Sequence, residues 1–415
     1  MPQHASELRV DGDRLWASLM EMARIGATAK GGCRRIAFSA EDDAARALFK
    51  SWCVEAGLDV VFDRFGNMFA RRAGREDGAP VVLGSHLDTQ PTGGRFDGIL
   101  GVLAALEAVR CLNDAAVTTR RPLVIANWTN EEGAIIRPMI GSETFTGALP
   151  LAEALALTDD AGTSISELLA GMQNGAGPLE VGFPIHRYLE LHIEQGPILE
   201  NEGGQIGIVT GGIGFRRYVF NFQGQEAHAG PTPMESRKDA MVAAARAVLM
   251  ADTAARGKPG ARATIGQLHT RSGSPNTVAA DVEMTLDLRH GDNAVLDALE
   301  QEVLSGIARM ASDQGVSVSW REVANSSAVP FDAEVIAVVA DAAGALGYRS
   351  SRMLSGAGHD ACHIARKYPA GMIFVPSANG LSHNEAEYTA PDDCRAGADV
   401  LLRAALHFAE PVGPA

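Results

Sequence analysis

Cysteine is scarce in this chain. Its 415 residues include only 5 cysteines, and no two of them are spaced as Cys-x-x-Cys. A sparse set with an odd count argues against a disulfide framework and against a structural zinc ribbon. We therefore expect Cys33, Cys53, Cys111, Cys362 and Cys394 to be reduced and mostly buried thiols.

An excess of positive charge and long apolar runs are also lacking. Lys and Arg number 36 against 51 Asp and Glu, which gives a formal net charge of −15. Such a chain is a poor candidate for binding nucleic acid or an anionic membrane. The longest apolar stretch, about Ile99–Val109, is too short to span a bilayer, and the polar segment Met1–Arg14 does not read as a signal peptide. We expect a soluble cytoplasmic protein with no nucleic-acid and no membrane partner.

Several common catalytic and nucleotide-binding motifs are missing as well. The chain has no Gly-x-Ser-x-Gly, the nucleophile turn of many serine hydrolases. It has no Gly-x-x-x-x-Gly-Lys-Ser/Thr phosphate loop and no convincing Gly-x-Gly-x-x-Gly after a strand. These absences argue against a serine hydrolase of that type and against nucleotide binding through those loops.

What the sequence does contain is an ordinary globular composition, 46% hydrophobic and 21% charged, in a chain long enough for two or three domains. Short apolar runs separated by helical patterns, such as Gly98–Leu112, predict buried strands of an α/β sheet. The predicted strands are Pro80–Leu83, Leu123–Trp128, Tyr188–Ile193 and Gly371–Val375. Each is followed directly by polar residues, and sites in open α/β folds lie beyond the carboxyl ends of the strands.

The segment Gly214–Asn325 has a different pattern. It predicts the order β-α-β-β-α-β, which is typical of a ferredoxin-like α+β domain. The predicted elements are Arg216–Phe222, Ser236–Arg256, Arg262–Leu268, Val278–Arg289, Asn293–Gln314 and Val316–Glu322. Plausible hinges, Gly211–Gly214 and Ser326–Pro330, flank it. We therefore predict a mixed-sheet α/β domain made of residues 1–212 and 328–415, with an inserted domain at 213–327.

Histidines and carboxylates gather at the predicted strand ends. His86, Asp88 and Asp97 come after the first of these strands, and the adjacent pair Glu131 and Glu132 comes after the next. His192 and His383 accompany the two later strands. Imidazole and carboxylate ligands suit divalent metals such as zinc, and two adjacent carboxylates can divide metal binding from proton transfer.

Motifs along nearly the whole chain resemble the amidase, hydantoinase/carbamoylase family, dinuclear metal amidohydrolases related to metal-dependent aminopeptidases. The matching stretches are Gly84–Thr89, Gly93–Gly98, Asn130–Gly133, Leu191–Gly196, His228–Met234, Asn276 with Asp287–Arg289, Ser355–Ala361 and Ser382–Glu385. The resemblance implies a metallopeptidase-like catalytic domain, with the inserted domain acting as a lid and dimerisation domain. It also implies two divalent metal ions per chain, zinc first, with manganese, cobalt or nickel as alternatives.

The same resemblance implies the roles of individual residues around the metals. His86 and His192 would hold one metal, Glu132 and His383 the other, and Asp97 would bridge them. Glu131 would be the general base, and Asp88 would orient His86.

Further residues would bind the substrate. His228 would stabilise the developing oxyanion from the partner subunit of a homodimer, and Arg289 would bind a substrate carboxylate with its planar guanidinium. Gln195, Asn276, Gly358 and Arg217 would complete the substrate site.

The activity implied is hydrolysis of the ureido C–N bond of N-carbamoyl-L-amino acids, giving the L-amino acid, CO2 and ammonia. Allantoate amidohydrolase is the first alternative, followed by β-ureidopropionase and a peptidase. A non-catalytic binding protein on the same fold is the alternative from another class.

Overall fold

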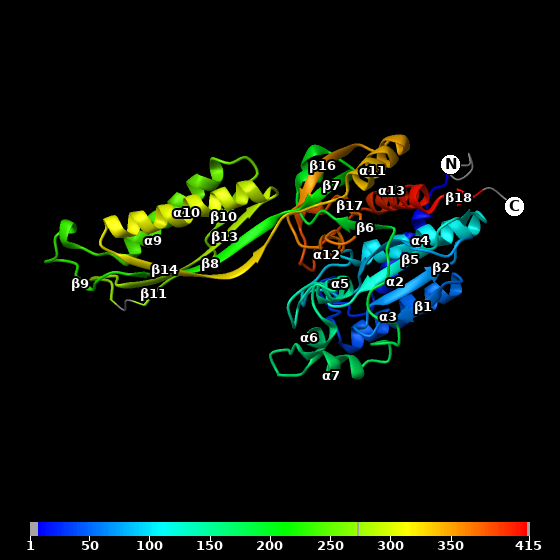
Figure 1. The fold of residues 1–415 in the computed structure, drawn as a ribbon, viewed down its shortest axis with the longest axis horizontal. Coiled ribbons are helices and arrows are strands. Elements are labelled where there is room, and N and C mark those ends of the chain that lie inside the picture. The colour runs from blue at the N-terminus through cyan, green and yellow to red at the C-terminus, as the bar shows by residue number, and fades with distance from the viewer. Residues whose placement is uncertain (1–6, 272–273, 413–415) are drawn as a thin grey trace. The chain divides into compact units, whose positions relative to one another are not determined.

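The computed structural model describes residues 7–271 and 274–412. Its chain forms two compact units: one contains the chain up to Thr210 and from Pro330 onward, and the other is Gly211–Val329. Both are drawn in Figure 1. The first six residues of the polar segment Met1–Arg14 lie outside the described range.

The first unit is built on a nine-stranded mixed sheet with the order β1-β2-β5-β3-β6-β17-β7-β15, in which β16 also pairs with β7. The strands are β1 (Asp59–Phe62), β2 (Met68–Arg72), β3 (Val81–His86), β5 (Leu123–Trp128), β6 (Arg187–Ile193), β7 (Ile206–Gly212), β15 (Val329–Pro330), β16 (Ser350–Ser355) and β17 (Ala370–Val375). The pair β4 (Thr118–Thr119) and β18 (Pro411–Val412) lies apart from it.

Four central strands run parallel and decide where a site can form. β3 pairs in parallel with β5 and β6, and β6 pairs in parallel with β17. Almost every residue of these strands is buried, because helices and loops cover both faces. Their carboxyl ends share one edge of the sheet, so the segments that follow them converge there.

Each face of this sheet has its own apolar core. Leu83, Ile125 and Leu191 face the core covered by the long helices α4 and α13. Val82, Val124 and Phe374 face the opposite core, which Phe145 of α5 also enters. The helices of this unit are α2 (Gly12–Met22), α3 (Ala40–Glu55), α4 (Ile99–Asp114), α5 (Ile140–Thr146), α6 (Leu151–Ala156), α7 (Ile165–Ala170), α8 (Ile198–Glu202), α11 (Ala333–Leu346), α12 (Asp360–Ile364) and α13 (Pro391–Ala409).

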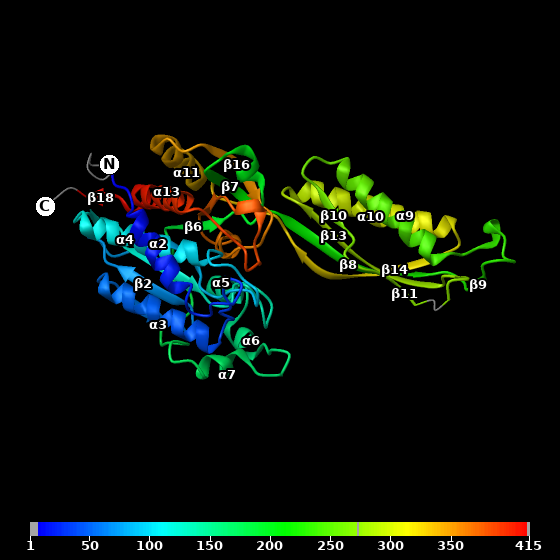
Figure 2. The same ribbon diagram turned by 180° about the vertical axis from the view of Figure 1, so that it is seen from behind.

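The second unit has the predicted ferredoxin-like topology. Its sheet has the order β10-β13-β8-β14, with β11 also paired to β13, and each of these strand pairs is antiparallel. Helices α9 and α10 lie side by side on one face (Figure 2), where alanines of α9 pack against Phe220 and Leu286. The elements are β8 (Gly214–Gln223), β9 (Ala227–His228), α9 (Ala240–Arg256), β10 (Arg262–Thr264), β11 (Leu268–Thr270), β12 (Thr277–Val278), β13 (Asp281–His290), α10 (Asn293–Asp313) and β14 (Ser317–Ser326).

The fold class predicted from the sequence is confirmed, and the differences are local. The strand predicted at Arg262–Leu268 is two short strands, β10 and β11, and the helix predicted from Ser236 begins at Ala240 after its cap Asp239. Among the described residues, no helix combines the length and apolar character needed to cross a membrane.

Candidate metal centre and active site

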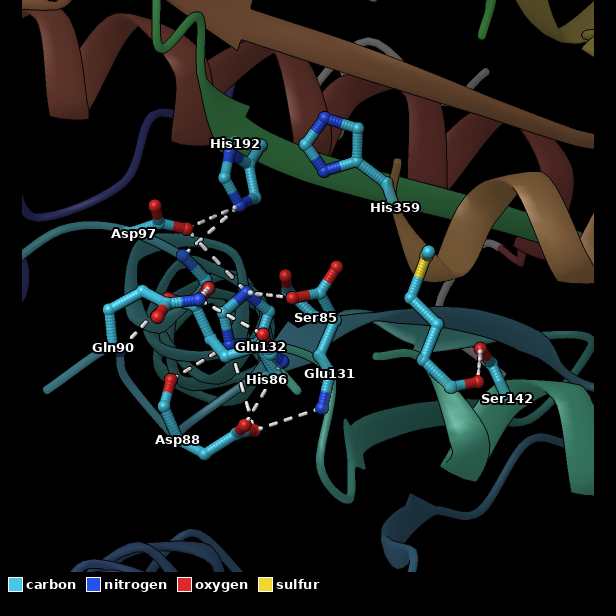
Figure 3. A network of polar contacts seen from close by, with 12 residues as sticks. Ser85, His86, Asp88, Gln90, Asp97, Glu131, Glu132, Ser142, His192 and His359 are labelled. Carbon is cyan, nitrogen blue, oxygen red and sulfur yellow. Dashed lines mark hydrogen bonds and ion pairs between the residues drawn. The ribbon is translucent and has the colours of Figure 1, made fainter. Parts of the chain in front are cut away.

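The carboxyl ends of the parallel strands bring the predicted ligands together. Within the described residues, His86, Asp97 and His192 form one group whose ligand atoms lie within 4.8 Å of one another, and Asp97, Glu132 and His383 form another. The two groups share Asp97, whose Oδ1 lies 3.1 Å from His192 Nε2 and whose Oδ2 lies 3.6 Å from His383 Nε2. These two groups contain the residues that the family resemblance assigned to the two metals, and a third group, Glu190, His192 and His359, shares His192. Figure 3 shows most of these residues.

Both buried histidines turn the same ring nitrogen into this centre. His86 Nδ1 lies 2.9 Å from the backbone carbonyl oxygen of Asp88, and His192 Nδ1 lies 2.9 Å from that of Ile193. A backbone carbonyl on one ring nitrogen fixes the ring and directs the other nitrogen toward the centre, where His192 Nε2 also accepts the backbone N–H of Gly98 at 3.2 Å. His86 Nε2 is buried without a hydrogen-bond partner, and carboxylate oxygens of Glu131 and Asp97 lie 3.4 and 3.6 Å away. These residues fit a divalent cation.

Glycines in the Gly93–Gly98 motif give the ligands room. Gly98 has φ +71°, and a Cβ there would collide with the His86 ring. A Cβ at Gly94 would collide with the carboxylate of Glu387. The motif is therefore explained by close packing as well as by Asp97 itself.

Glu387 is a site residue that the sequence reading missed. Its Oε1 accepts hydrogen bonds from the backbone N–H groups of Phe96 (3.0 Å) and Asp97 (3.1 Å). Its Oε2 lies 3.1 Å from Ser382 Oγ, which donates to Asp97 Oδ2 at 2.9 Å. Burial raises the pKa of Glu387 to about 7. The only signal in the sequence is its place four residues after His383.

Asp88 supports the centre through its side chain as well as through its backbone carbonyl. Its carboxylate accepts the backbone N–H groups of Glu131 (3.3 Å) and Glu132 (3.1 Å), while its backbone carbonyl contacts His86 (Figure 3). Gln90, also missed from the sequence, donates through Nε2 to Glu132 Oε2 at 2.9 Å. The two adjacent glutamates are thus held by different partners.

Glu131 has the surroundings of a proton acceptor. Burial raises the pKa of its carboxyl well above the usual range, and His86 opposes this only in part. A buried carboxyl that holds a proton readily, next to a candidate metal centre, suits general acid–base chemistry. Beside it, His359 stacks edge-on against His192 with ring centroids 4.5 Å apart. Burial lowers the pKa of His359 well below its usual range, so this imidazole is neutral.

The predicted substrate residues divide between the two units. Gln195 and Gly358 line a pocket with Glu131 and with every ligand residue except His86, and Gln195 Nε2 donates to Asp97 Oδ2 at 2.8 Å. His228, Asn276, Arg217 and Arg289 lie in the Gly211–Val329 unit.

In that unit, His228 and Asn276 are exposed and close in the sheet. β9 pairs with β12, and the Ala229 N–H donates to the Asn276 carbonyl at 2.8 Å. The His228 Nδ1 accepts the Gly230 N–H at 3.1 Å, which leaves Nε2 as the nitrogen able to donate to a ligand.

The two predicted arginines share one carboxylate. Arg289 Nε donates to Asp287 Oδ1 at 2.7 Å, and Arg217 Nε donates to Asp287 Oδ2 at 2.9 Å. Both guanidinium groups lie over the Phe215 ring. With Arg262, which the sequence reading did not single out, they line a hollow of about 540 Å³. Three guanidinium groups against one carboxylate make this hollow suitable for an anion.

Comparison with known proteins identifies the family of this chain. The model of peptidase family M20/M25/M40 matches residues 82–407. The chain belongs to this family. M20 members are metal-dependent, in keeping with the two ligand groups. An N-carbamoyl-L-amino-acid amidohydrolase of Rhizobium meliloti is 45% identical over 406 residues, covering 97% of each chain.

Two further M20 relatives support the same placement. An allantoate amidohydrolase of Bacillus subtilis is 33% identical over 389 residues, covering 92% of this chain and 93% of its own. The crystal structure of an amidase of the hydantoinase/carbamoylase family from Burkholderia multivorans is 46% identical, with a TM-score of 0.94, covering 98% of this chain and 100% of its own. The family resemblance seen in the sequence is confirmed.

Proposed function

We propose that this M20 protein hydrolyses the ureido C–N bond of N-carbamoyl-L-amino acids. The reaction consumes one water and yields the L-amino acid, CO2 and ammonia. The observation that carries the proposal is the buried Glu131 beside two ligand groups that share Asp97. The name of the Rhizobium meliloti relative, 45% identical, supports the choice of substrate.

Two divalent metal ions per chain, zinc first, would be held by His86 and His192 on one side and by Glu132 and His383 on the other, with Asp97 between them. When bound, such ions polarise a carbonyl and lower the pKa of water. Manganese, cobalt and nickel suit the same mixture of imidazole and carboxylate ligands.

The protein's own groups would then move the proton and hold the substrate. Glu131 takes the proton from the attacking water and returns it to the leaving nitrogen. Asp97 is kept in place by Gln195, Ser382 and Glu387. His359, neutral and packed on His192, keeps that ring oriented.

Residues of the Gly211–Val329 unit would bind the rest of the substrate. Arg289, assisted by Arg217, would hold the carboxylate in place of Asp287, and Asn276 would add a hydrogen bond. His228 would donate to the oxyanion that develops on the carbonyl oxygen. We propose that this His comes from the partner subunit of a homodimer.

Allantoate is the second candidate substrate, because it also presents a ureido group and a carboxylate, and one relative is named an allantoate amidohydrolase. The test is ammonia release from a panel of N-carbamoyl-L-amino acids, allantoate, β-ureidopropionate and dipeptides. The enzyme is first stripped with chelator and then reloaded with zinc, manganese, cobalt or nickel.

We expect no turnover after chelation and the highest kcat/KM on N-carbamoyl-L-amino acids after reloading. A higher kcat/KM on allantoate would make allantoate the substrate in place of N-carbamoyl-L-amino acids. Activity only on dipeptides would reject a ureido substrate. Full activity of a metal-free preparation would reject the metal-dependent mechanism, and binding of these compounds without turnover by the loaded protein would indicate a binding protein.

A further inference from the structure

The pocket beside the ligand groups is small, about 180 Å³. Its polar lining consists of four of the five ligand residues (all but His86), together with Glu131, Gln195 and His359. The rest of the wall is apolar and is formed by Pro138, Met139, Ala357 and Gly358. An apolar wall opposite acid–base groups limits the size of whatever lies between them.

Met139 is the only long side chain in this apolar wall. Its backbone has φ +59° at the N-terminus of α5, and its N–H donates to the carbonyl oxygen of Glu131 at 2.9 Å. The base and Met139 are therefore fixed to each other through one hydrogen bond. This hydrogen bond joins the two ends of the loop formed by residues 132–138.

The end of the Met139 side chain lies over Gly358. A Cβ built at Gly358 would stand 2.8 Å from Met139 Cε and 3.2 Å from its Sδ. The thioether end therefore packs directly against Gly358 and closes the pocket on that side, and a side chain at position 358 would require the thioether to move. A flexible methionine fills such an irregular gap well.

Resting on the proposed function, we propose that Met139 sets the size limit for the group attached to the scissile carbonyl. The residues proposed to hold the amino-acid carboxylate, Arg289 and Asn276, belong to the other unit. Glu131 and four of the five ligand residues, the groups proposed to act on the scissile carbonyl, line the same pocket as Met139, so we assign the carbamoyl end of the substrate to this wall. On this proposal an NH2 or CH3 group is accepted beside the thioether, whereas a longer acyl chain competes for the volume that Sδ and Cε occupy.

The test is an acyl series on one L-amino acid: N-carbamoyl, N-formyl, N-acetyl, N-propionyl and N-butyryl. In the wild type we expect kcat/KM to fall sharply between the acetyl and propionyl compounds. In Met139→Ala the ratio of propionyl to carbamoyl hydrolysis should rise by about tenfold or more, the effect of one methylene in an apolar pocket. Met139→Leu, of similar volume, is the matched control and should keep the wild-type order.

An unchanged ratio in Met139→Ala, or an equal loss on every compound, would overturn the proposal, because a residue with only a structural role changes all substrates alike. Calorimetric binding of the same series to zinc-loaded Glu131→Gln chains, with and without Met139→Ala, gives a size limit that does not depend on turnover. If the wild type acts on the N-acyl compounds but not on N-carbamoyl ones, the proposed function fails. The effect of Met139 is then still measured in the N-acyl series.

Discussion

Glu131 and Glu132 are adjacent in the sequence but differ in their surroundings. Glu131 Oε2 lies 3.4 Å from His86 Nε2 and belongs to neither of the metal-ligand groups in the described chain. Glu132 belongs to the group with Asp97 and His383, and Gln90 holds its carboxylate. Backbone geometry separates them, because Asp88 fixes both N–H groups and so sets the direction of each side chain.

This difference predicts separate losses in two isosteric variants. Glu131→Gln should keep its metals and lose about 10²–10⁴-fold in kcat, because an amide cannot accept the proton. Glu132→Gln should bind one metal more weakly. Metal content by mass spectrometry and kcat on one N-carbamoyl-L-amino acid provide the comparison. Equal metal loss in both variants would contradict the division of roles.

Glu387 offers a second prediction at the level of single residues. Glu387→Ala removes the acceptor of the Phe96 and Asp97 N–H groups, so the Asp97 carboxylate loses its fixed position. We expect metal affinity, measured by competition with a chelating dye, to fall about 10–100-fold, as for other partners of metal ligands. Glu387→Gln is the control, because its amide oxygen can still accept both bonds. Unchanged affinity in the alanine variant would limit Glu387 to packing.

The strand-end residues could be predicted because a chemical signal and a local pattern coincide. His86, Glu131 and His192 each stand at or just after a buried apolar run, which the sequence displays directly. Glu387 could not be found in this way, since its bonds to Phe96 and Asp97 join residues about 290 positions apart. Met139 was missed for the same reason, because its role depends on contact with Gly358 across the fold.

At the level of the elements, the start of α3 shows how the hydrogen bonds of a helix cap can differ from those that its sequence motif predicts. The sequence Ser39-Ala-Glu-Asp42 is of the type that predicts a reciprocal capping box, in which the Asp42 carboxylate would bond back to the Ser39 N–H. Ser39 does accept the Asp42 N–H, but the Asp42 carboxylate bonds the N–H of Phe38 instead. An aspartate is one methylene shorter than the glutamate that usually completes this motif. The helix therefore begins at Ala40 after its cap Ser39, with a different set of hydrogen bonds.

Strand β13 gives the prediction at this scale. It places Asp287 and Arg289 on the same face, two residues apart, where Arg289 has a carboxylate partner that a substrate carboxylate could replace. Arg289→Lys should raise KM for an N-carbamoyl-L-amino acid by about tenfold, the loss of one charge-assisted hydrogen bond of about 1.5 kcal/mol. KM for the corresponding amide should change much less.

Arg256→Lys is the matched control for this experiment, because Arg256 is exposed and paired only with Asp252 within its own helix. Steady-state kinetics on both substrates measure the effect. If Arg289→Lys penalises the acid and the amide equally, the role of Arg289 is to support the sheet.

At the scale of the whole molecule, the single chain forms two units. One unit contains the ligand groups, and the other contains His228, Asn276 and Arg289. The second unit leaves β14 at the edge of its sheet and exposes the apolar side chains of Leu249, Trp320 and Val323. An open edge and exposed apolar groups favour pairing about a two-fold axis. This supports the proposed homodimer, in which each His228 serves the partner's ligand groups.

The proposed exchange of His228 predicts complementation between two inactive variants. We mix His228→Ala chains with Glu131→Gln chains and allow subunits to exchange, which native mass spectrometry verifies. If His228 acts on the partner, the mixed dimer contains one site with both Glu131 and His228 intact and regains activity there. If His228 acts within its own chain, every site lacks one group and the mixture stays inactive. His228→Ala mixed with a second His228→Ala sample is the control, and persistent inactivity despite proven exchange would reject action across subunits.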